Sequence, residues 1–214
     1  MIRLLVWGGH CGQCPGLFTM LVTGILIQSI LNAASGSGQQ LREDINAGVF
    51  DRFKTLPISP IVPLAGQLVG DVFRLLVSGL MALVTAFMMG WRPVVSPLVL
   101  IGVLLLAVFV GWSLSWVFAL VGLMVKNAAL ISSLSMIIIL MLTFLSNAFI
   151  PTKTLPHLLQ TIVRLNPVSL TITAMRTILR TGHWGPDAFG VLLSGFLIIV
   201  IFMPLTVLAY RRFG

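Results

Sequence analysis

The two cysteines, Cys11 and Cys14, stand in the sequence HCGQCP near the start of the chain. A CxxC pair can act as a redox centre or supply half of a metal site. A zinc site takes about four ligands, whereas the next two histidines, His157 and His183, lie far along the chain. We therefore predict no metal site and interpret residues 1–15 as a leader of unknown role.

Signatures of catalysis are missing from the sequence. A membrane-embedded enzyme needs a convergent set such as Ser with His, paired carboxylates or an HExxH zinc motif, and no HExxH and no cluster of aspartates occurs. The GxxxxGK[ST] loop that binds nucleotide phosphates is also absent. The sequence thus predicts a protein that is not an enzyme and holds no cofactor of its own, with an intramembrane enzyme as the weaker alternative.

One pair of opposite charges stands inside an apolar run. Asp71 and Arg74 are three residues apart, which places them on one face of a helix. An ionisable residue within a membrane span is a functional candidate by default. Because the pair lies close to the start of its run, we favour a local salt bridge at headgroup level over a substrate or proton site. Gly66 and Gly70, just before it, are spaced for close helix packing.

Composition defines the solvent of most of the chain. Of 214 residues, 58% are hydrophobic and 8% charged, too few charges to cover a soluble protein. The net charge of +8 comes from bases scattered between apolar runs, which is typical of membrane topology and not of nucleic-acid binding. We predict an all-α polytopic membrane protein.

The apolar runs predict five transmembrane helices. The tract from 94 to 150 would be about 85 Å long as one helix, so it must fold back, and Lys126-Asn127 is the only plausible turn. The predicted spans are about 16–34, 63–90, 94–125, 128–150 and 188–210.

Polar residues inside these spans are few. We expect them to form hydrogen bonds between helices, with the lining of a substrate path as the alternative. They are Gln28, Asn32, Ser78, Ser113, Ser115, Ser132, Ser133, Ser135 and Asn147.

The loop 35–60 holds a four-residue apolar repeat, Leu41, Ile45, Val49 and Phe53. This spacing predicts a short amphipathic helix, lying flat on a membrane surface or against a partner. Ser37 and Gln40 resemble a capping box at its start, and Pro57 and Pro60 would end it.

The segment 151–186 is divided by Pro151, Pro156 and Pro167. A structureless loop of this length would be unusual. We predict two short amphipathic or re-entrant helices here, before the last span.

Two motifs carry a family resemblance. The run GQQLREDINAGVFDRFKTLPIS, residues 38–59, resembles the cytoplasmic loop of type-2 ABC exporter permeases, and the daunorubicin-resistance permeases most of all. FLSNAFIP, residues 144–151, followed by Pro156, Asn166, Pro167 and Arg176, resembles the last external segment of that family. The resemblance covers about residues 18–212.

The resemblance implies a function. Such permeases pair as homo- or heterodimers in the plasma membrane, here a prokaryotic inner membrane, and dock two ATPase subunits that bind ATP and magnesium. They export hydrophobic or amphipathic cargo, such as a drug, lipid or lipid-linked glycan. The loop 35–60 would be cytoplasmic, with Asp51, Arg52, Phe53, Lys54 and Pro57 contacting the ATPase, and 151–186 would be extracytoplasmic.

The resemblance also exposes one departure. Family members usually have six spans, and the resemblance implies that the first one is absent from this sequence, while residues 1–15 match no family motif that we identify. We expect either a misassigned or truncated start, or a partner that supplies the missing helix. A truncated or non-transporting membrane scaffold is therefore the alternative to an active permease.

Overall fold

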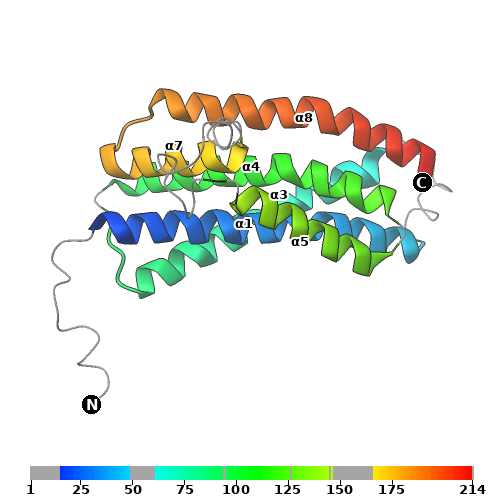
Figure 1. Ribbon diagram of the computed structural model, residues 1–214, viewed down its shortest axis with the longest axis horizontal. Helices are drawn as coiled ribbons and strands as arrows, with labels where there is room; N and C mark the ends of the chain where they lie inside the picture. Colours follow the sequence, from blue (N-terminus) through cyan, green and yellow to red (C-terminus); the bar gives the residue numbers. More distant parts are fainter. Residues whose placement is uncertain are drawn as a thin grey trace, which may run out of the picture.

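The computed structural model describes residues 15–48, 61–93, 95–125, 127–144, 146 and 166–213. The described residues form six helices and no strand. In chain order the helices are α1 (Pro15–Asn46), α3 (Ile61–Met88), α4 (Pro97–Met124), α5 (Ala128–Phe144), α7 (Pro167–Thr181) and α8 (Pro186–Phe213) (Figure 1).

Four of these helices, α1, α3, α4 and α8, are long and apolar enough to cross a membrane. The all-α polytopic prediction is therefore confirmed. Helix α5 has 17 residues and is about 26 Å long, slightly shorter than a hydrocarbon core of about 30 Å. It matches the start of the predicted span 128–150, of which residues 147–150 lie outside the described residues. The turn predicted at Lys126-Asn127 falls between α4 and α5.

Helix α4 is the centre of the bundle. Its sequence is apolar on every side, which favours a helix buried all round. It contacts α1, α3, α5, α7 and α8 (Figure 1). In its most apolar stretch of 18 residues, 56% is buried, whereas only 17% of the corresponding stretch of α8 is buried. The other helices therefore surround α4 and present their remaining apolar faces outward.

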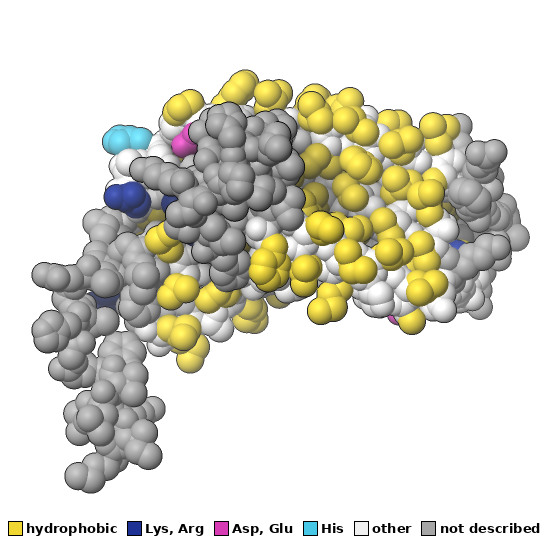
Figure 2. Space-filling model, viewed as in Figure 1, with side chains coloured by type: hydrophobic (Ala, Val, Ile, Leu, Met, Phe, Trp, Pro, Cys, Tyr) yellow, Lys and Arg dark blue, Asp and Glu magenta, His cyan; other side chains and the backbone are white. Residues whose placement is uncertain are grey.

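Those outward faces carry large hydrophobic side chains. Figure 2 shows them spread over much of the described surface on one side of the molecule. Examples are Phe73 and Met81 on α3, Met136 and Ile137 on α5, and Phe189 and Phe196 on α8. In a soluble protein so much exposed apolar surface would drive aggregation, whereas in a bilayer it faces lipid or other apolar helices.

Helix α1 corrects one prediction. The sequence predicted a span ending near residue 34 and a separate amphipathic helix starting at Ser37, but α1 continues without a break to Asn46. Leu41 is fully buried and Ile45 packs beside it, against a cluster that includes Leu123 and Tyr210. The apolar stripe thus faces the bundle, and not a membrane surface. The rest of the stripe, Val49 and Phe53, lies outside the described residues.

Close backbone packing explains why the helix continues. A Cβ atom on Gly38 would collide with the backbone carbonyl of Phe118, and one on Gly122 with the backbone of Gly38. The contact between α1 and α4 therefore requires glycine at these two positions. Gly66 and Gly70, where close packing was predicted, have open space around them.

The two ends of the bundle are distinct. At one end α1 finishes and α3 begins, α4 turns into α5, and α8 terminates; we call this the first-loop end (Figure 1). At the opposite end, the α7 end, α3 turns into α4 and α7 turns into α8. Helix α7 is one of the two short helices predicted in 151–186; the other would fall on residues that the structure does not describe.

Candidate functional site

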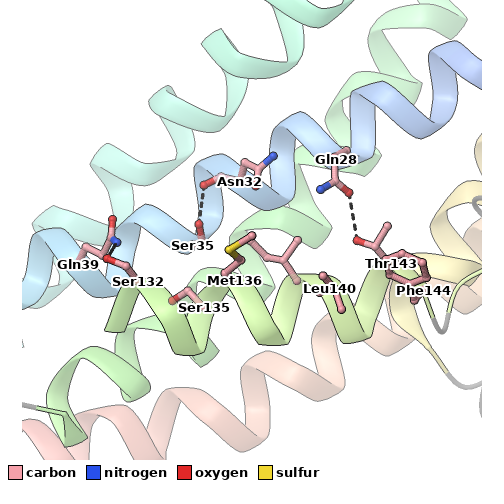
Figure 3. Close-up of a pocket in the computed structure, with 11 residues that line it drawn as sticks. Gln28, Asn32, Ser35, Gln39, Ser132, Ser135, Met136, Leu140, Thr143 and Phe144 are labelled. Carbon is pink, nitrogen blue, oxygen red and sulfur yellow. Dashed lines mark hydrogen bonds between the residues drawn. The ribbon is translucent and has the colours of Figure 1, made fainter. Parts of the chain in front are cut away.

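A cavity of about 460 Å³ lies between α1 and α5. We call it the α1–α5 groove. Both helices contribute polar side chains, and Met136, Ile139 and Leu140 of α5 add apolar ones. The polar lining residues are Gln28, Asn32, Ser35 and Gln39 from α1, and Ser132, Ser135 and Thr143 from α5 (Figure 3).

Helix periodicity places the α1 residues together. Gln28, Asn32, Ser35 and Gln39 recur at intervals of three and four residues, so they form a single stripe along α1. On α5 the same spacing joins Ser132 and Ser135, while the neighbouring Ser133 is exposed and donates its hydroxyl to the carbonyl of Ala129 at 3.1 Å.

Each end of the groove is closed by a hydrogen bond between the two helices (Figure 3). Toward the α7 end, the hydroxyl of Thr143 donates to Oε1 of Gln28 at 3.1 Å. Toward the first-loop end, Nε2 of Gln39 donates to the hydroxyl of Ser132. The expectation of hydrogen bonds between helices is thus met at these two pairs.

Ser135 lies between these two pairs and is only 3% exposed. Ser135 lines the groove, and its hydroxyl is buried without a hydrogen-bond partner. A buried polar group without a partner costs about 1–3 kcal/mol. A molecule in the groove with a polar group at this depth would supply the missing partner, while its apolar part met the methionine, isoleucine and leucine.

The charged pair predicted on α3 forms an ion pair about three to four turns after the start of that helix. Nη2 of Arg74 lies 2.7 Å from Oδ1 of Asp71, whose side chain is 3% exposed. Arg74 also donates to two side chains of α1, at 3.0 Å to Oε1 of Gln40 and at 2.9 Å to the hydroxyl of Ser37. The pair does not line the α1–α5 groove.

Three residues of the motif that resembles the family's last external segment lie in α7 or directly before it. Asn166 caps α7, because its Oδ1 accepts from the backbone N–H of Val168 at 3.0 Å, and its Nδ2 donates to the carbonyl of Leu142 on α5 at 2.8 Å. Pro167 is the first residue of α7. Arg176 lies half-buried on the same helix, and burial lowers the pKa of its guanidinium.

The remaining predicted site residues lie outside the described residues. They are Asp51, Arg52, Phe53, Lys54 and Pro57 in the segment between α1 and α3, which we call the first loop (residues 47–60), and Pro151 and Pro156 after α5. Most of the groove's polar residues could be identified one by one in the sequence, but the sequence did not show which of them meet across the groove. The only available signal was the three- and four-residue spacing along each helix.

A bundle of span-length apolar helices, with a polar groove between α1 and α5, is the architecture of a multi-pass membrane protein. The chain matches the ABC-2 type transporter family over residues 1–179. It belongs to this family and is therefore the membrane subunit of a transporter, as the two sequence motifs indicated. The match starts at residue 1 and so includes the leader, which we had placed outside the resemblance.

Curated relatives agree with the family. The daunorubicin resistance ABC transporter permease protein DrrB1 of Streptomyces coeruleorubidus is 33% identical over 214 residues, covering 99% of this chain and 75% of the relative. The doxorubicin resistance permease DrrB of Mycobacterium tuberculosis is 30% identical over 122 residues, covering 57% of this chain and 42% of that protein.

Proposed function

We propose that the chain is the permease subunit of an ATP-driven exporter and that the α1–α5 groove lines the path of an amphipathic, drug-like cargo. Family membership and the relatives' names, which refer to daunorubicin and doxorubicin resistance, support this class of activity. The observation that carries the proposal is the buried hydroxyl of Ser135 in a groove with both polar and apolar lining. A lipid or a lipid-linked glycan is the alternative cargo.

A second permease subunit completes the proposed site. Polar side chains facing hydrocarbon are costly, and Asn32 and Ser132 are exposed along the open side of the groove. A second copy, or a related chain, placed against α1 and α5 would cover this stripe and enclose the cargo.

ATP and magnesium would be bound by separate ATPase subunits docked at the first loop. Helix α1 links this loop to the groove, because one uninterrupted helix carries Gln28, Asn32 and Gln39 on its side and continues to Asn46. A displacement of the loop by the ATPase would therefore move one wall of the groove directly.

The groove is tested by filling it. We expect Ser135→Phe to lower ATP-dependent cargo export by about tenfold or more, because a phenyl ring would occupy the space of the cargo. The matched control is Ser133→Phe, which places the same ring on the exposed face of α5. Export is measured in vesicles that contain the chain and its ATPase. Normal export by Ser135→Phe would show that cargo does not pass through this groove.

The first loop is tested by charge reversal. We expect Arg52→Glu combined with Phe53→Ala to abolish co-purification with the ATPase while membrane insertion stays intact. Undiminished ATPase binding would contradict the coupling role. If the wild-type chain exports no cargo with any ATPase, the scaffold alternative holds.

A further inference from the structure

Arg74 joins the two helices that flank the first loop. Its guanidinium reaches from α3 to α1, where it donates to Gln40 and to Ser37 at 3.0 and 2.9 Å. A third bond at 2.7 Å ties the same group to Asp71 on its own helix. The planar guanidinium suits this arrangement, since its donors are held in a fixed fork and point to several acceptors at once.

The neighbouring residues are shaped around this contact. Gly36 of α1 lies directly under the guanidinium, and a Cβ atom there would lie 3.3 Å from Nη1 of Arg74. One turn before Asp71 on α3, Nε2 of Gln67 donates to the backbone carbonyl of Ser37 at 3.3 Å. These side chains form a single polar contact between α1 and α3, which we call the clasp.

The position of the clasp determines how a force on the first loop acts on α1 and α3. Arg74 lies about three to four turns into α3, and Ser37 and Gln40 lie about two turns before the end of α1. The clasp thus ties together the helix that enters the first loop and the helix that leaves it. Without it, a force on the loop could separate the two helices instead of moving both.

The same turn of α1 contacts its other neighbours in different ways. Gly38 packs backbone to backbone against α4, and Gln39 makes one hydrogen bond to Ser132 of α5. On the α3 and α4 sides α1 is therefore held by several bonds or by close packing. On the α5 side, the hydrogen bond between Gln39 and Ser132 closes the groove at this level in the part of the chain that the structure describes.

We propose that Arg74 is a positioning residue that makes α1 and α3 move as one body at the first-loop end. When the groove opens, it is then α5 that separates from α1. This inference rests on the proposed exporter function for its consequence, but the mechanical statement can be tested without an ATPase. No part of it requires Arg74 to touch the cargo.

The first experiment measures the distance between α1 and α3. Spin labels are placed at Glu43→Cys and Gly66→Cys in the full chain, with Cys11 and Cys14 replaced by serine. We expect a narrow distance distribution that broadens in Arg74→Gln and in the double variant Ser37→Ala with Gln40→Ala. The double variant keeps the Asp71–Arg74 pair and the bond from Gln67 to the backbone of residue 37, so it removes the two bonds that Arg74 makes to α1 without leaving a buried carboxylate unpaired. An unchanged distribution in the double variant would overturn the proposal.

The second experiment measures coupling in vesicles that contain the ATPase. We expect the double variant to export about tenfold less cargo per ATP hydrolysed, which corresponds to the loss of about 1.4 kcal/mol of interhelical bonding. Arg92→Gln, an exposed arginine at the α7 end, is the control and should behave as the wild type. A parallel fall in export and ATP hydrolysis would indicate a merely structural role and overturn the proposal. Absence of export by the wild type would instead contradict the proposed function and leave the distance result standing.

Discussion

Asn166 shows how one side chain can connect two helices of this fold. Its Oδ1 caps the first turn of α7, and its Nδ2 bonds to the carbonyl of Leu142 near the end of α5. Pro167 supports the same start, because proline is favoured at the first position of a helix. Asn166 and Pro167 therefore connect the end of α5 to the start of α7. This contact is the physical reason for the Asn-Pro pair.

The two roles of Asn166 can be separated by substitution. Asn166→Ser keeps a cap acceptor but cannot reach Leu142, and we expect it to cost about 1 kcal/mol. Asn166→Ala loses both bonds and should cost about 2 kcal/mol. Thermal unfolding of the detergent-solubilised chain measures both. Equal destabilisation by the two variants would mean that the cap contributes nothing.

At the scale of elements, the contact between α1 and α4 shows where sequence reasoning reached its limit. The Ser-Gly-Ser-Gly sequence at 35–38 favours a helix end by local propensity. Packing against Gly122, more than 80 residues away in the chain, outweighs that preference. A single sequence shows each glycine but not which distant glycine it meets.

This contact predicts a difference between two glycines of the same helix. Gly38→Ala should destabilise the bundle by about 1–3 kcal/mol, because the added methyl would overlap the backbone of α4. Gly24→Ala meets open space and should be neutral or stabilising by up to about 1 kcal/mol. Thermal unfolding compares the two directly. Equal effects would show that the close approach does not hold α1 in place.

For the whole molecule, the order of the apolar helices along the chain was predictable, and the groove was not. Apolar runs of span length identify helices because the bilayer leaves the backbone few alternatives. The pairing of Gln28 with Thr143, and of Gln39 with Ser132, depends on α1 and α5 lying side by side. That adjacency results from how all helices surround α4, which local patterns do not encode.

The orientation of the bundle in the membrane can be tested at its two ends. The family resemblance places the first-loop end in the cytoplasm, and the fold groups the turn between α4 and α5 at that same end. Glu43 and Asn127 are exposed at the first-loop end, and Arg92 and His183 at the α7 end. Single cysteines at these four positions, with Cys11 and Cys14 changed to serine, should therefore divide into two pairs. We expect a membrane-impermeant maleimide to label Arg92→Cys and His183→Cys in intact cells, and the other pair only after permeabilisation. Labelling of Glu43→Cys in intact cells would reverse the orientation and place the proposed ATPase contact on the wrong side.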